Sequence, residues 1–171
     1  MSKLDIVTLP DPILRKVSKS VERVDDDVRQ LLDDMLETMY EAPGIGLAGI
    51  QVAVPKRVLV LDVADHETEE PNPICMVNPQ ILSTSEETRV YEEGCLSLPD
   101  IRVEIERPSE ITVRYIDRNG TEQELTTDGL LATAIQHEID HLDGKLIIDF
   151  LSSLKRNMAI RKLRKISRSK N

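Results

Sequence analysis

The chain contains few aromatic residues. Its 171 residues include one Phe, three Tyr and no Trp. A core without large rings must be built from Ile, Leu, Val and Met, and a surface without them lacks the stacked rings on which many proteins bind single-stranded nucleic acid. The composition therefore argues against a base-stacking platform, and we expect no DNA partner.

Two further absences concern the compartment. The only cysteines are Cys75 and Cys95, so the sequence does not have the pattern of a disulfide framework. No apolar run approaches membrane-spanning length, and the first residues resemble neither a signal peptide nor a transit peptide. We expect a cytoplasmic protein without a membrane partner, whose thiols are free or bound to metal.

Charge is distributed unevenly along the chain. The net charge is −9, from 22 basic and 31 acidic residues. Eight basic and no acidic residues lie between Lys155 and the C-terminus, so the rest of the chain, with 14 basic and 31 acidic residues, carries −17. The basic end either meets an anionic partner or is a solvated, partly frayed segment, and the sequence leaves both readings open.

Length and patterning predict one α+β domain over residues 1–171. Apolar residues at helical spacing after Val24 predict a first helix that ends at Pro43-Gly44. A second helix is expected from Thr127-Asp128 to Gly144, and a basic helix at about 152–168. Strand-like segments lie between the first two helices, at 57–63, 74–77, 80–84, 88–91, 101–106, 110–116 and 121–126.

Two of the three histidines occur at the spacing of a metal site. His137 and His141 lie in Gln136-His137-Glu138-Ile139-Asp140-His141. Residues i and i+4 of a helix share a face, so both imidazoles can reach one metal ion, and Glu138 is close enough to move protons at a metal-bound water. The motif predicts a hydrolytic metal site and most often marks a protease.

A catalytic site of the zinc type uses three protein ligands. Gluzincin proteases take a downstream Glu and metzincins a downstream His, but no Glu follows Glu138 and no His follows His141. An upstream donor remains, and Cys95 stands beside a glycine that allows close backbone approach. We expect Cys95 to be the third ligand, Cys75 to be structural and His66 to be a solvated loop residue.

Three stretches resemble the signature motifs of the peptide deformylases. They are Gly44-Ile45-Gly46-Leu47-Ala48-Gly49-Ile50-Gln51, Glu93-Gly94-Cys95-Leu96-Ser97 and the histidine motif described above. Their order and spacing match, and the similarity covers nearly the whole chain. The first motif departs from the family at Gly49 and Ile50, where a second Ala and then Pro or Thr are common, but Gln51 is kept.

The resemblance implies the fold and the chemistry of that family. The fold has mostly antiparallel sheets around a central metal-binding helix, with a C-terminal helix. The reaction removes the N-formyl group from the initiator methionine of new polypeptides and releases formate. A metal-bound water attacks the formyl carbon, with Glu138 as general acid and base. The Gln51 amide and the Leu96 backbone N–H bind the oxyanion.

The same resemblance assigns the cofactor and the substrate contacts. One divalent ion, natively Fe²⁺ and in purified protein also Zn²⁺, Ni²⁺ or Co²⁺, is held by Cys95, His137 and His141. Candidates for the methionine pocket are Ile45, Tyr91, Leu130, Thr133 and Ala134, all of which could equally be core. Gly46 and Gly94 let the peptide backbone run close. Arg102 aligns with a basic residue near the peptide's exit path, with an ordinary surface Arg as the equal alternative.

The basic C-terminal helix gains a candidate partner from the resemblance, because related bacterial enzymes dock this helix on the ribosome near the tunnel exit. The residues expected to contact ribosomal RNA phosphates are Lys155, Arg156, Arg161, Lys162, Arg164 and Lys165.

Two alternatives remain open. One is a metalloprotease that uses the same histidine motif, which the missing downstream ligands and the Cys95 motif disfavour. The other is a closed structural zinc site with a fourth protein ligand, for which the spare thiol and imidazole are Cys75 and His66, neither well placed by sequence. Such a site has no use for Glu138 or Gln51.

Overall fold

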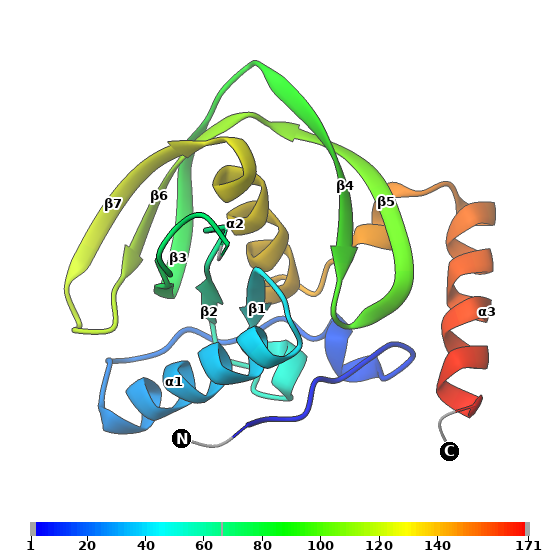
Figure 1. Cartoon of the computed structure of the whole chain (residues 1–171), viewed down its shortest axis with the longest axis horizontal. Coiled ribbons are helices and arrows are strands. Elements are labelled where there is room, and N and C mark those ends of the chain that lie inside the picture. The colour runs from blue at the N-terminus through cyan, green and yellow to red at the C-terminus, as the bar shows by residue number, and fades with distance from the viewer. Residues whose placement is uncertain (1–2, 66, 170–171) are drawn as a thin grey trace.

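The computed structural model describes residues 3–65 and 67–169. In chain order its elements are η1 (Pro12–Arg15), α1 (Asp26–Glu41), β1 (Gly46–Ala48), η2 (Gly49–Val52), β2 (Val58–Leu61), β3 (Ile74–Thr84), β4 (Thr88–Cys95), β5 (Leu98–Pro108), β6 (Glu110–Ile116), β7 (Glu122–Asp128), α2 (Gly129–Leu142), η3 (Ile147–Phe150) and α3 (Ser153–Ser169). Figure 1 shows α2 at the centre, with strands on both sides and with α1 and α3 at the periphery.

Two antiparallel sheets flank α2. The larger has the strand order β1-β2-β3-β6-β7, and the smaller is the β4–β5 pair. In Figure 1 the smaller sheet lies on the side of α2 toward α3, while β6 and β7 lie on the opposite side. The expected α+β fold, with antiparallel sheets around the helix that carries the histidines, is confirmed.

The central helix is buried along most of its length. Ile135, Ile139 and Leu142 pack in one apolar cluster with residues of β2, β3 and β6. The residues from Ala132 to Ile139 are all buried, as expected for a helix covered on several sides. Burial of a polar group is energetically unfavourable unless the group forms a hydrogen bond or binds a ligand. The buried polar residues of α2 therefore require partners.

Helix α1 covers the outer face of the larger sheet. Its N-cap is Asp25, whose side chain accepts a hydrogen bond of 2.9 Å from the Val28 N–H. Leu32, Met35 and Met39 are completely buried and cluster with residues of β1 and β2. This helix begins and ends close to its predicted limits, because an N-cap and a proline fix both ends.

The strands differ from the prediction in three respects: β1 was not expected, β4 and β5 are longer than expected, and two expected segments are joined in β3. Segments 74–77 and 80–84 form a single strand, β3, whose pairing with β6 shifts register between Val77 and Gln80. Asn78 adopts φ 51 there, and its side chain donates to Val21 O and accepts from Val21 N, both at 2.8 Å. The interruption in the pattern is therefore a bulge inside one strand. Across the described residues, none of the helices combines the length and apolarity needed to cross a membrane.

Candidate metal centre and active site

Three potential ligands converge where α2 passes the end of β4. The ligand atoms of Cys95, His137 and His141 all lie within 4.8 Å of one another, and Cys95 Sγ is 3.3 Å from His141 Nε2. Both imidazoles are buried. One thiol and two imidazoles suit a borderline-soft divalent ion such as Fe²⁺ or Zn²⁺, so these residues fit a metal centre.

A buried carboxylate holds the ring of His137. The His137 Nδ1–H donates to Glu93 Oε1 at 3.0 Å, which leaves Nε2 as the ligand atom. Arg107 donates twice to Glu93, at 2.7 and 3.0 Å, and once to Asp140, at 2.9 Å. Carboxylate partners of this kind orient metal-binding histidines and increase their basicity.

Three residues of this network were not predicted from the sequence to be functional: Glu93, Arg107 and Asp140. A signal for Arg107 was available, because it continues the alternation of Ile101, Val103 and Ile105 and therefore had to point inward. A buried Arg needs a carboxylate partner. That partner could not be chosen from the sequence, since Glu93 lies on another strand.

Burial and mutual contacts alter the protonation of the site. Burial raises the pKa of Glu138 to about 7. Burial also lowers the pKa of His141 well below its ordinary value. The effect of burial on His137 is outweighed by Glu138, Cys95 and Glu93, which raise its pKa. For Glu93 the penalty of burial is outweighed by hydrogen bonds, first that from His137, and its pKa is lowered.

The Glu138 carboxylate lies beside the metal ligands, and one of its oxygens is available for a further hydrogen bond. Its Oε2 is 3.9 Å from His137 Nε2. Within the described residues its buried Oε1 has no hydrogen-bond partner. A Cβ at Gly46 would lie 2.6 Å from Oε2, so the glycine leaves the space that this carboxylate occupies. The arrangement allows Glu138 to exchange a proton with a molecule bound at the centre.

Gln51 is fixed from both ends of its amide. Its Oε1 accepts from the Ala48 N–H at 2.9 Å, so Nε2 faces the site, 3.1 Å from Ser97 Oγ and 3.5 Å from Cys95 Sγ. Leu96 follows Cys95 and lines the same pocket. These two residues are thus placed where an amide N–H could bind a developing oxyanion.

A cavity of about 370 Å³ opens over the centre. It is lined by all eight residues predicted for substrate binding: Ile45, Gly46, Tyr91, Gly94, Arg102, Leu130, Thr133 and Ala134. Gln51, Cys95, Leu96, His137 and Glu138 line it as well, whereas His141 is buried behind it. The predicted site residues therefore lie in one place, with exposed Ile45 and Leu130 among the lining.

The remaining candidates lie elsewhere. Cys75 is on β3 and does not belong to the ligand cluster, and burial raises its pKa to about 11. An unreactive thiol agrees with the structural role expected for it. His66 lies outside the described residues.

Comparison with known proteins identifies the family. A sequence model of the family described as "Polypeptide deformylase" matches residues 3–157. The peptide deformylase of Rhizobium meliloti is 58% identical over 165 residues, covering 96% of this chain and 94% of that protein. That of Agrobacterium fabrum is 56% identical over 165 residues, covering 96% of both.

Solved structures agree with these relatives. The crystal structure of peptide deformylase from Ehrlichia chaffeensis has a TM-score of 0.94 at 43% identity and covers 99% of each chain. A second structure from that organism, in complex with actinonin, has a TM-score of 0.93 at 46% identity, with 98% of this chain and 99% of that chain covered. The chain belongs to the polypeptide deformylase family.

Proposed function

We propose that the enzyme removes the formyl group from N-formylmethionyl peptides as they are made in the cytoplasm, releasing formate and a free amino terminus. The observation that carries the proposal is the single cavity that combines a Cys–His–His centre, the uncommitted carboxylate of Glu138 and an apolar lining. The substrate follows from the family and from the size and lining of this cavity.

Cys95, His137 and His141 would hold one divalent cation, natively Fe²⁺, with Zn²⁺, Ni²⁺ or Co²⁺ as substitutes. When bound, the cation acts as a Lewis acid that lowers the pKa of water and polarises the formyl oxygen. The chain's part is to present the three ligands in fixed orientations. Glu93 does so for His137 through the hydrogen bond at Nδ1.

Glu138 moves the proton. Its carboxylate takes a proton from the attacking water, whose oxygen adds to the formyl carbon, and returns it to the amine nitrogen as the C–N bond breaks. Burial supports this role, because a carboxyl with a pKa of about 7 both accepts and donates protons near neutral pH.

Gln51 and Leu96 stabilise the charge that develops on the formyl oxygen. The Gln51 Nε2–H and the Leu96 backbone N–H donate to this oxygen. The hydrogen bond from Ala48 to Gln51 Oε1 holds the amide in the donating orientation. Loss of one such donor typically slows turnover by about 100-fold or more.

The rest of the pocket holds the peptide. The methionine side chain is placed among Ile45, Tyr91, Leu130, Thr133 and Ala134. Gly46 and Gly94 admit the peptide backbone at close range. Arg102 lies at the exit path of the peptide.

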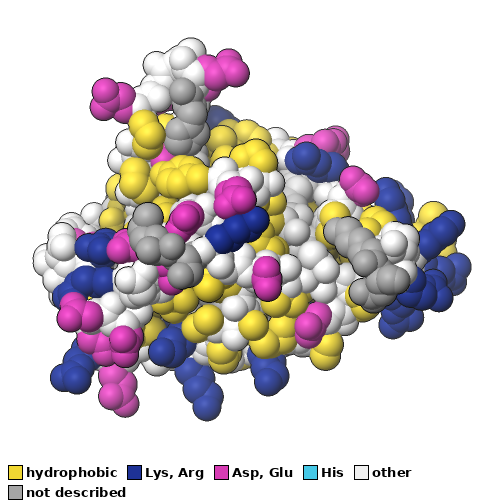
Figure 2. Space-filling view, turned by 60° about the horizontal axis from the view of Figure 1, so that its bottom comes forward, with side chains coloured by type: hydrophobic (Ala, Val, Ile, Leu, Met, Phe, Trp, Pro, Cys, Tyr) yellow, Lys and Arg dark blue, Asp and Glu magenta, His cyan; other side chains and the backbone are white. Residues whose placement is uncertain are grey.

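The basic helix α3 is the proposed contact with the ribosome, within one domain that extends over residues 1–171. Figure 2 shows Lys and Arg side chains gathered around the C-terminal helix at the right-hand edge of the molecule. The proposed contacts to RNA phosphates are Lys155, Arg156, Arg161, Lys162, Arg164 and Lys165. Deletion of residues 155–171 should weaken ribosome binding at low salt, and unchanged binding would exclude α3 as the contact.

One product analysis distinguishes the proposal from its two alternatives. The metal-loaded enzyme is incubated with a formyl-Met peptide and with its unformylated counterpart, and the products are identified by mass spectrometry. A deformylase removes only the formyl group, a metalloprotease cleaves peptide bonds in both peptides, and a closed structural zinc site leaves both unchanged.

A further inference from the structure

An open groove of about 710 Å³ lies along β5 and α3. Its exposed apolar lining is the half-exposed ring of Phe150, and its floor is formed by Ile101, Val103 and Ala159, which are buried and pack in one cluster. Lys155 and Lys162 of α3 also line the groove. They lie on the same helix face as Ala159, because Ala159 is four residues after Lys155 and three residues before Lys162. Figure 1 shows α3 standing beside β5, away from the larger sheet.

The edge of a strand faces this groove. Every residue from Asp100 to Glu104 contributes to its lining. Successive side chains of a strand point to opposite faces, so an unbroken run of lining residues indicates that the strand edge borders the groove. Among the residues that the structure describes, β5 pairs with no strand other than β4. An unpaired strand edge presents N–H and C=O groups that can pair with an extended peptide.

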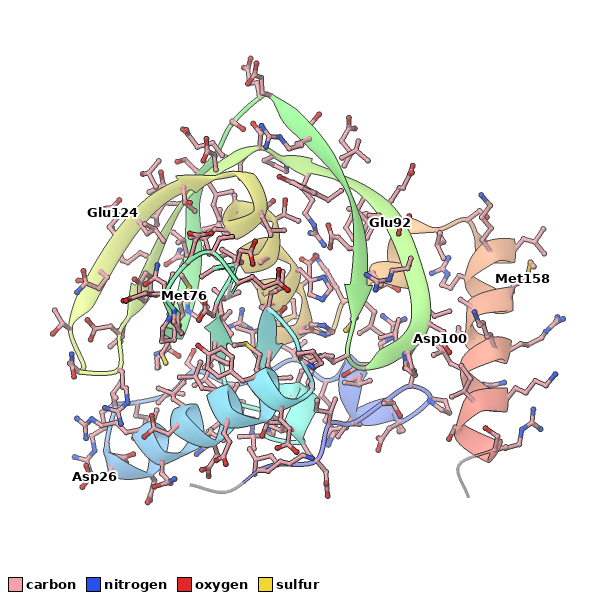
Figure 3. All side chains as sticks on the ribbon, viewed as in Figure 1. Asp26, Met76, Glu92, Asp100, Glu124 and Met158 are labelled. Carbon is pink, nitrogen blue, oxygen red and sulfur yellow. The ribbon has the colours of Figure 1, made fainter. Side chains whose placement is uncertain are left out.

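The groove adjoins the catalytic pocket. Asp100, Ile101 and Arg102 line both. Arg102 pairs with Gly94 in the β4–β5 ladder, and a Cβ at Gly94 would lie 2.7 Å from its guanidinium nitrogen. The Arg102 side chain thus lies across the boundary, and Figure 3 shows Asp100 at the end of β5 toward α3.

We propose that the groove holds the part of the nascent chain beyond its third residue, added as an extended strand to the free edge of β5. The inference rests on the proposed function and extends it beyond the catalytic pocket. Five residues of strand span about 16 Å, so the groove accommodates about five residues of substrate.

The charges of the groove favour an acidic segment. Arg102, Lys155 and Lys162 outnumber Asp100 and Glu104, whereas the whole chain has a net charge of −9. Lys162 Nζ donates to the Asp100 carbonyl at 3.1 Å, so it is held beside the strand edge. An acidic residue downstream of methionine gains attraction from these cations, and a basic residue is repelled.

The experiment compares formyl-Met peptides of three and nine residues with the metal-loaded enzyme. The nine-residue peptides carry either acidic or basic residues after the third position. We expect kcat/KM for the acidic nonapeptide to exceed that for the basic one by about fivefold, mainly through KM, and the difference to shrink in high salt. Charge reversal in Lys155→Glu/Lys162→Glu should invert the preference, and Lys155→Arg/Lys162→Arg should keep it.

A double variant at Arg23 and Lys56, each changed to Glu, controls for net charge because both are exposed and lie outside the groove. Its preference between the nonapeptides should equal that of the native enzyme. Equal kcat/KM for both nonapeptides in the native enzyme would overturn the inference. So would a Lys155/Lys162-dependent dimer in sedimentation, because a second copy would then occupy the groove. Absence of formate from the tripeptide would instead contradict the proposed function.

Discussion

The His137 Nδ1–H donates to Glu93 Oε1 at 3.0 Å, and this bond connects the metal centre to a buried ion pair. The side chains of Glu93 and Arg107 are each 6% exposed, so the pair is shielded from solvent. The guanidinium of Arg107 also lies over the Phe150 ring, with its carbon 5.0 Å from the ring centroid. The orientation of one ligand thus depends on contacts that reach β5, α2 and η3.

Glu93→Gln should weaken metal binding. The substitution preserves the size of the side chain but removes the charge that fixes the His137 ring, so the affinity for Zn²⁺ or Fe²⁺ should fall by about 10- to 100-fold. Competition with a chelator measures the change. Glu92→Gln is the matched control, since Glu92 is the exposed neighbour on the same strand. Native affinity in Glu93→Gln would contradict the role assigned to this hydrogen bond.

Gly46→Ala should impair turnover while the fold and the metal are retained. The added Cβ would meet Glu138 Oε2 at 2.6 Å and displace the carboxylate. A displacement of about 1 Å in a catalytic group can cost about 100-fold in rate, and kcat should fall by that order. Gly120→Ala is the control: φ is +82 there and no atom of the described residues lies within 4 Å of the added Cβ, so it should lower stability without reducing kcat. A fully active Gly46→Ala enzyme would argue against this account of Glu138.

Leu32→Ala should destabilise the fold strongly. Leu32 is completely buried between α1 and the larger sheet, and truncation of such a side chain leaves a cavity. The free energy of unfolding should fall by about 2–5 kcal/mol in chemical denaturation. Leu154→Ala on α3 removes the same atoms, but Leu154 is 72% exposed. This variant should change the free energy of unfolding by less than about 0.5 kcal/mol. Equal losses in the two variants would show that α1 is not part of the core.

The contact between Arg15 and Asp149 should make stability depend on pH. Arg15 donates to both carboxylate oxygens, at 2.7 and 2.9 Å. Burial opposes ionisation of Asp149, but the Arg15 hydrogen bonds outweigh it and lower its pKa. Because the folded pKa lies below the unfolded value of about 3.9, the stabilisation is present at neutral pH and is lost as pH falls through the folded pKa.

Asp149→Asn should therefore be less stable than the native protein by about 1 kcal/mol at pH 7, since the pair is partly exposed. The difference should shrink as pH falls below about 4. Urea titrations at several pH values measure it, with exposed Glu124→Gln as the control. A difference that grows toward acid would reverse the predicted sign.

The sequence predicted the elements more accurately than their pairing. Helix α1 has an N-cap and a terminating proline, and α2 carries a strong motif, so local signals sufficed for both. The bulge at Asn78 was not predicted, because it depends on hydrogen bonds to Val21 in a distant segment. Cys95 was found only because the motif lacked its usual third ligand.

The limits of prediction at the site have a similar origin. Arg107 lies on the buried face of β5, as the alternation of apolar and polar residues along the strand indicates. Its partner Glu93 could not be identified in this way, because the contact depends on the pairing of β4 with β5. The groove beside β5 could not be predicted, because it depends on where α3 packs. Residues that belong to a recognisable motif were identified, and those whose role depends only on the pairing of strands were not.

The central claim is that Glu138 moves the proton in formyl-amide hydrolysis at the Cys95–His137–His141 centre. The most direct test measures formate released from a formyl-Met peptide by native protein and by Glu138→Ala, each with its metal content determined. Native protein should release formate in step with free amino termini, and Glu138→Ala should bind the same amount of metal but lose turnover. Formate release by Glu138→Ala at the native rate, or none from metal-loaded native protein, would contradict the account.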